Sequence, residues 1–272
     1  MIQSCMVCGG TSMRYWDTHK GIDVFICEGC GHGVSDMPPG LSDEAGEIYD
    51  GEYYAAMSYD RKWRFRVGRA ARWMRYMMEL RRPPGHSLDI GCSLGYYMAA
   101  AQRLGWTPHG TDISQHALQL SRERGMDVFY SRHPDEFPKD LPPLDIVTAA
   151  QVVEHFPDPI DYLMALKAKM APGGLIYIQI PNFMKLIRQG PQAPYVGPPE
   201  HVHFFTLDTA HAALEKAGWE LVRPPIIRPS TIGWRLWMWI PELIYEMPRE
   251  IIRDPITRNG KLSNMHLFAR AV

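Results

Sequence analysis

"LDIGCSLGYYMAA" (residues 88–100) carries the pattern that decides the fold, because a short apolar strand runs through two glycines into a helical stretch. Gly91 and Gly95 follow Asp89 within six residues. Glycine lets the main chain approach a ligand closely, and the first turn of the following helix offers unpaired N–H groups. The stretch therefore predicts a ligand-binding turn at the end of a buried strand.

Strands and helices alternate on the C-terminal side of this turn. The apolar patterns predict strands over 87–91, 107–113, 126–130, 144–151 and 175–182, and helices over 95–105, 114–125 and 158–174. Ser114 is the expected N-cap of the second helix, and Gly105 and Gly125 are the expected helix stops. The alternation predicts a doubly wound α/β sheet that binds ligands at the carboxyl ends of its strands.

Asp112 ends the second predicted strand, about twenty residues after the turn, where a carboxylate can accept the hydroxyl hydrogens of a ribose. The alternative is that Asp112 only caps the next helix. The spacing from Gly91 to Gly95 lacks the G-x-G-x-x-G phosphate turn. These features favour a ligand that has a ribose but no pyrophosphate.

Four of the five cysteines form two C-x2-C pairs, Cys5 with Cys8 and Cys27 with Cys30, separated by eighteen residues. This spacing is typical of a four-thiolate zinc site, and the alternative is four free or disulfide-bonded cysteines. Four thiolates close the tetrahedron, so the zinc is expected to be structural and the nearby His19 and His32 to lie at the surface.

The composition is that of an ordinary globular protein. The chain has 272 residues, of which 46% are hydrophobic and 22% charged, with a formal net charge of -1. This charge gives no global field for nucleic acid or anionic membrane. The N-terminus lacks a signal-peptide pattern and no apolar run is long enough for a transmembrane segment, so a cytoplasmic location is expected.

Two segments leave alternatives open. The stretch 59–82 predicts a helix with an apolar face and an arginine-rich face, which either covers the next domain or contacts RNA, lipid or phosphate. The tail after residue 224 has three tryptophans within six residues. They form either a peripheral membrane contact or hydrophobic acceptor surface, or a patch buried against the sheet or in a homodimer.

The motifs "LDIGCSLG", "GTDIS", "LDIVTAAQVVEHFPDP" and "MAPGGLIYIQIPN" resemble, in order and spacing, those of the class I S-adenosylmethionine-dependent methyltransferases. The chain is most similar to the bacterial branch with an N-terminal four-cysteine ribbon, which is related to ubiquinone-type and sugar methyltransferases. The resemblance implies a Rossmann-like seven-stranded sheet and S-adenosylmethionine as cofactor. It implies that the cofactor-binding residues are Asp89, Gly91, Cys92, Gly95, Asp112, Ile113 and Gln151.

Four regions are expected. Residues 1–40 form a zinc ribbon, and 41–85 form a linker and a basic helix that covers the active site. Residues 86–225 form the cofactor-binding core, and 226–272 form an extension that completes the sheet or covers the substrate site.

Three histidines are candidates for the proton acceptor that a hydroxyl or carbon nucleophile needs. His201 and His203 alternate in a strand-like run and are expected to point to one side, while His155 follows the fourth strand. The favoured function is methyl transfer to a sugar, a lipid-linked compound or a secondary metabolite. The alternatives are a zinc-containing RNA methyltransferase, which the charge and the sequence after the fourth strand disfavour, and an inactive zinc-ribbon interaction protein.

Overall fold

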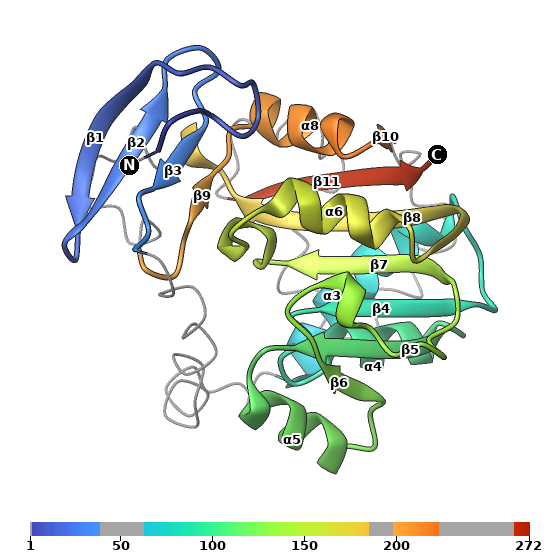
Figure 1. Cartoon of the computed structure of the whole chain (residues 1–272). Coiled ribbons are helices and arrows are strands. Elements are labelled where there is room, and N and C mark those ends of the chain that lie inside the picture. The colour runs from blue at the N-terminus through green and yellow to red at the C-terminus, as the bar shows by residue number, and fades with distance from the viewer. Residues whose placement is uncertain (1, 39–62, 185–197, 223–263) are drawn as a thin grey trace.

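The computed structural model describes residues 2–38, 63–184, 198–222 and 264–272, which form one large and one small sheet (Figure 1). The large sheet has seven strands: β4 (His86–Ile90), β5 (Thr107–Asp112), β6 (Val128–Tyr130), β7 (Leu144–Ala150), β8 (Met170–Pro181), β10 (Trp219–Leu221) and β11 (Asn264–Ala271). Their order is β10-β11-β8-β7-β4-β5-β6, and β11 runs antiparallel to both of its neighbours. The predicted seven-stranded, doubly wound sheet is confirmed.

Helices cover both faces of this sheet. They are α3 (Trp63–Met78), α4 (Tyr96–Arg103), α5 (Gln115–Glu123), α6 (Pro159–Lys167) and α8 (Leu207–Lys216), with single 3-10 turns at Pro134–Glu136 and Val153–His155. Alternate residues of β8 separate the two cores: Tyr177 packs with α3 and α4, whereas Ile176 and Ile178 pack with α6 and α8. Figure 1 shows α6 and α8 on one side of the sheet and α3 and α4 on the other.

The helix signals of the sequence are confirmed at α4 and α5. The Ser114 hydroxyl accepts a hydrogen bond from the Ala117 N–H at 3.2 Å. Gly105 and Gly125 follow the two helices with φ values of 92° and 75°, a region that glycine enters without strain.

The predicted helix over 158–174 is wrong at its C-terminal end. α6 ends at Lys167, and β8 begins three residues later at Met170. Pro172 has no N–H and disfavours helix in the residue before it, and Gly173 has a φ of 68°. These residues therefore form an irregular start of β8, where its register with β7 shifts between Leu144 and Ile146.

The predicted basic helix is α3, and its apolar face packs on the sheet. Val67, Ala70, Met74 and Met77 are buried there. Several arginines are engaged within the protein: Arg66 lies over the Tyr96 ring, and Arg81 donates two hydrogen bonds to one carboxylate oxygen of Asp145. These contacts favour the covering role of α3 over nucleic-acid contact.

The small sheet joins the N-terminal segment to the segment just before α8. It contains β1 (Met13–His19), β2 (Ile22–Cys27), β3 (Gly33–Ser35) and β9 (His203–Phe204), in the order β1-β2-β3-β9. β3 pairs antiparallel with β9, which comes almost 170 residues later (Figure 1). A further bond runs from the Lys216 ammonium group to the Met6 carbonyl at 2.6 Å. The ribbon is thus bonded to the large domain at two places.

Several predictions fall outside the described residues. They concern the linker 41–62 and the tryptophans of the tail, Trp234, Trp237 and Trp239. Of the 226–272 extension, β11 is described and lies inside the large sheet between β10 and β8. No helix of the described part is long and apolar enough to span a membrane.

Substitution of Gly33 tests the joint between ribbon and domain. A Cβ at Gly33 would lie 2.8 Å from Phe183 and 2.9 Å from the Phe204 Cβ, so Gly33→Ala should destabilise the protein by about 1–3 kcal/mol through overpacking. Gly68→Ala is the matched control. Its Cβ would meet no atom within 4 Å, and alanine is favoured over glycine in a helix by roughly 0.5–1 kcal/mol. The urea midpoint of unfolding should fall for Gly33→Ala and rise for Gly68→Ala. A midpoint for Gly33→Ala at or above that of the wild type would contradict the close packing between ribbon and domain.

Candidate functional site

The turn after β4 has the close backbone approach that the sequence predicted. Gly91 and Gly95 have φ values of 65° and 83°. A side chain at Gly91 would collide with Val152, which follows β7, and one at Gly95 would collide with Met126. The carboxyl ends of the neighbouring strands β4 and β7 therefore meet at this turn.

Asp112 lies at the carboxyl end of β5 and faces the same turn. Its two carboxylate oxygens accept hydrogen bonds from the Ser93 N–H at 2.8 Å and the Ser114 N–H at 2.9 Å. Burial raises the pKa of Asp112, and these N–H groups oppose the shift. Each carboxylate oxygen keeps a lone pair for a further donor. Beside it, the buried Ser93 hydroxyl has no hydrogen-bond partner within the described residues.

Asp89 is a buried carboxyl group on the same side of the sheet. One of its oxygens accepts a hydrogen bond from the Thr148 hydroxyl at 2.6 Å. Burial raises the pKa of Asp89 to about 8, so the ionised carboxylate would be stabilised by a cationic partner. A cofactor that carries an ammonium group and two ribose hydroxyls fits the donor and acceptor groups around this turn.

The other predicted cofactor residues border this region. Cys92 is buried with Met98, Leu118 and Val128, and burial raises the pKa of its thiol, which argues against a reactive thiolate. Ile113 follows Asp112 directly. Gln151, after β7, has a φ of 60°, and its backbone N–H donates to the Gln179 carbonyl at 2.7 Å.

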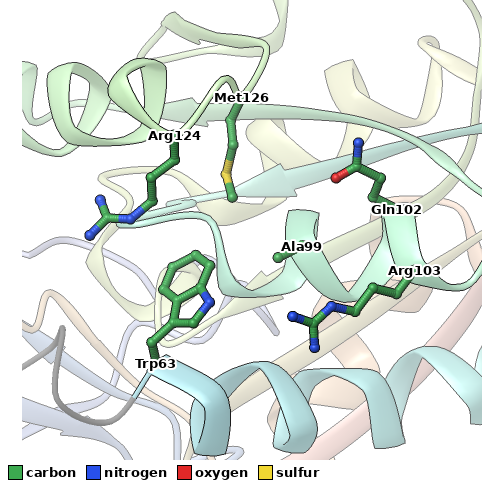
Figure 2. A pocket seen from close by; sticks show the side chains of 6 residues that line it. All are labelled: Trp63, Ala99, Gln102, Arg103, Arg124 and Met126. Carbon is green, nitrogen blue, oxygen red and sulfur yellow. The ribbon is translucent and has the colours of Figure 1, made fainter.

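A hollow of about 520 Å³ lies between the start of α3, α4 and the segment that follows α5. Figure 2 shows its lining residues: Trp63, Ala99, Gln102, Arg103, Arg124 and Met126. Arg124 lies over the Trp63 ring, 5.2 Å from its centre. None of the predicted cofactor or catalytic residues lines this hollow, although Met126 of its lining packs against Gly95 of the turn.

The four ribbon cysteines lie together, as their spacing predicts. Their sulfur atoms lie within 4.8 Å of one another, with Cys5 and Cys30 at 3.6 Å and Cys8 and Cys27 at 3.5 Å. Gly9 and Gly31 have φ values of 76° and 79°, as expected for the tight turns that place such thiols. Burial raises the pKa values of Cys5 and Cys30. A zinc ion would reverse this shift, since it binds the thiolate form.

His203 and His32 form a buried hydrogen-bonded chain between the ribbon and the large domain. His32 Nε2 and His203 Nδ1 are hydrogen-bonded at 3.1 Å, and His203 Nε2 donates to the Pro157 carbonyl at 3.1 Å. His203 Nδ1 must therefore accept, and His32 Nε2 donates to it. Burial lowers the pKa of His203 to about 4. With both ring nitrogens engaged, His203 has no site for an acceptor's proton.

The expectation that His32 lies at the surface is wrong. Its side chain is fully buried and stacks on the His203 ring. His32 directly precedes β3, which pairs with β9. That pairing joins residues far apart in the chain and could not be read from the local pattern.

His201 and His155 lie next to each other. The centres of their rings are 4.8 Å apart, and His155 Nδ1 donates to the Glu200 carbonyl at 2.5 Å. Burial lowers the pKa of His155, and the carbonyl groups of Glu200 and Gln151 oppose the shift. His201 packs against His155, and His203 bonds to the Pro157 carbonyl, so both histidines contact the loop after β7.

Glu154 is a candidate site residue that the sequence analysis did not predict. Its side chain is 1% exposed, and neither carboxylate oxygen has a hydrogen-bond partner within the described residues. Burial raises its pKa to about 8, and the nearby backbone N–H groups of Glu154 and Val152 oppose the shift. The signal was its position between Val153 and Phe156, in the turn after a buried strand. A carboxylate at such a position is unfavourable unless it has a partner.

A family model described as "Methyltransferase domain" matches residues 61–223, more than half of the chain. The chain therefore belongs to the class I S-adenosylmethionine-dependent methyltransferase family, which confirms the resemblance. The part from β4 to β10 that carries the turn and Asp112 lies within this match.

Curated relatives carry the name "Ubiquinone biosynthesis O-methyltransferase". The protein from Thiobacillus denitrificans is 32% identical over 108 residues, which are 35% of this chain and 44% of the relative. The protein from Pseudomonas aeruginosa is 28% identical over 188 residues, which are 65% of this chain and 72% of the relative. The chain thus spans less than half of the first relative's length.

Among solved structures, the plantazolicin methyltransferase BamL, in complex with a triazolic desmethylPZN analog and SAH, has the same fold. The TM-score is 0.55 at 15% identity, over 85% of this chain and 94% of that chain. At this identity the comparison shows the fold alone.

Metal analysis tests the cysteine cluster. Protein purified without chelator should contain about one equivalent of zinc, and Cys27→Ser should lose it, because a structural site needs all four thiolates. Cys92→Ala is the control, since Cys92 lies outside the cluster. Elemental analysis that finds no zinc in the wild type, or equal zinc in Cys27→Ser, would show that the ribbon is not a zinc site.

Proposed function

We propose that the protein transfers a methyl group from S-adenosylmethionine to an oxygen of a small-molecule acceptor. The observation that carries the proposal is the convergence of the Gly91–Gly95 turn, Asp112 and the loop after β7 at neighbouring strand ends. Ligands of doubly wound sheets bind at such a switch point. Family membership and the O-methyltransferase names of the relatives support the proposal.

The cofactor would bind across the ends of β4 and β5. In this proposal Asp112 accepts hydrogen bonds from the ribose hydroxyls, and Ile113 lies beside them. The turn with Asp89, Gly91, Cys92 and Gly95 holds the methionine part, and the cationic amino group stabilises the ionised form of Asp89. Gln151 lies at the methyl end. The buried Ser93 hydroxyl without a described partner is a further donor for this ligand.

The acceptor would bind beside the loop after β7. Glu154, His155 and His201 gather there, while Val152 of the same loop contacts the glycine turn. Methyl transfer from a sulfonium mainly requires that the acceptor oxygen is aligned in line with the methyl–sulfur bond and shielded from water. The proposed acceptor is a sugar, a lipid-linked compound or a secondary metabolite, and the proposed location is the cytoplasm. The zinc ion of the ribbon is proposed to be structural.

Calorimetry with S-adenosylhomocysteine tests the cofactor site. Loss of the hydrogen bonds to a buried carboxylate costs roughly 2–4 kcal/mol, so Asp112→Ala should weaken binding by about one to three orders of magnitude. Glu123→Ala, an exposed substitution on α5, is the control and should bind like the wild type. Equal affinity of Asp112→Ala and wild type would remove Asp112 from the site.

The reaction itself is tested with isotope-labelled S-adenosylmethionine and a bacterial extract separated by molecular size. Label should enter the low-molecular-weight fraction with wild type and not with Asp112→Ala. Label confined to RNA or protein would overturn the proposed acceptor class.

A further inference from the structure

A second group of metal-ligating side chains lies next to the candidate site. Glu154, His155 and His201 each offer one ligand atom, and these three atoms lie within 4.8 Å of one another. Two come from the turn after β7, and the third comes from the segment just before β9. The two segments are bonded by the Val202 N–H, which donates to the Glu154 carbonyl at 3.0 Å.

The buried carboxylate of Glu154 points to a missing cation. Both of its oxygens lie out of contact with solvent and lack a hydrogen-bond partner within the described part of the chain. A buried carboxylate in this state is destabilised by several kcal/mol unless it is protonated or paired. His155 Nε2 lies 3.9 Å from a carboxylate oxygen of Glu154, which is too long for a hydrogen bond.

The hydrogen bonds of His155 prepare its other ring nitrogen for a metal. Because Nδ1 donates its hydrogen to the Glu200 carbonyl, Nε2 of the neutral ring carries the lone pair. This lone pair is on the nitrogen closest to Glu154. Metal-bound histidines are commonly oriented in this way, by a backbone carbonyl on the second nitrogen. His201 is held in turn by the ribbon, since the Ser35 hydroxyl donates to its carbonyl at 3.0 Å.

We propose that Glu154, His155 and His201 bind a divalent transition-metal ion at the acceptor side of the active site. One carboxylate and two imidazoles suit zinc, cobalt or iron, whereas magnesium prefers an all-oxygen set. Ligand bonds of about 2.0–2.2 Å draw the three side chains closer together than they lie without the ion. Three protein ligands leave a coordination position open, in contrast to the closed four-thiolate site of the ribbon.

The open position gives the ion a role that rests on the proposed function. An acceptor hydroxyl bound to the ion becomes more acidic and releases its proton to solvent. An oxygen lone pair then forms the bond to the methyl carbon while the carbon–sulfur bond breaks. The electron pair of that bond returns to sulfur, which yields the methyl ether and S-adenosylhomocysteine. In this account His201 is a metal ligand rather than the proton acceptor that the sequence suggested.

Cobalt titration of protein that holds one equivalent of zinc, in the ribbon, tests the site without any acceptor. Calorimetry and absorption should show one further equivalent of Co²⁺, without the intense thiolate-to-cobalt band that exchange into the ribbon would produce. Glu154→Gln and His201→Asn should each raise the dissociation constant at least about tenfold. His133→Asn is the control, because His133 is another histidine beside two carboxylates, Asp135 and Asp161, both of them exposed. It should leave cobalt binding unchanged.

S-adenosylhomocysteine binding by each variant reports whether it is folded. If Glu154→Gln does not bind S-adenosylhomocysteine, His201→Asn still provides the test, because His201 is only half-buried. The metal site is overturned if wild type takes up no cobalt beyond the ribbon, if the folded variants bind as tightly as wild type, or if His133→Asn loses as much affinity. Wild type that binds cobalt but no S-adenosylhomocysteine would overturn the proposed function and leave the metal site standing.

Discussion

The pairing of β3 with β9 is the interaction on which the proposed acceptor side of the molecule depends. Residues 201–205 lie between the two sheets and are bonded to both: the Ser35 N–H donates to the Val202 carbonyl at 2.9 Å, and the Val202 N–H donates to Glu154. On the large-domain side, the Phe183 N–H donates to the Phe205 carbonyl at 2.9 Å. The ribbon strand thus holds the backbone at His201 and Val202, through the Ser35 bonds to their carbonyl groups.

The buried histidines extend this connection without adding charge. Burial lowers the pKa values of His32 and His203, so both rings are neutral near pH 7, and their hydrogen bonds run in one direction toward the Pro157 carbonyl. A neutral chain of this kind avoids the desolvation cost of a buried ion. It connects the cysteine cluster to the loop that carries Glu154 and His155. A zinc ion in the ribbon would therefore influence the shape of the proposed acceptor site.

Local patterns predicted the parts of the structure that local physics decides. The strand–turn–helix at Gly91, the cap at Ser114 and the cysteine turns at Gly9 and Gly31 each depend on a few neighbouring residues, and all are found. The end of α6 was misplaced because Pro172 and Gly174, read as a helix stop, belong to a strand whose pairing with β7 takes over at Met170. The burial of His32 depends on pairing across almost 170 residues. The gathering of Glu154 with His201 depends on a contact between two segments that are separate in the chain, which no local pattern contains either.

Hydrogen exchange of the zinc-depleted protein, followed by mass spectrometry, measures the coupling between ribbon and acceptor site directly. The account predicts that zinc removal lowers protection in residues 201–205 and 152–157, because both segments depend on β3, while β4 and β5 keep theirs. Unchanged protection in 201–205, together with loss confined to residues 2–35, would show that the ribbon folds as an independent appendage. That result would contradict its role in shaping the site.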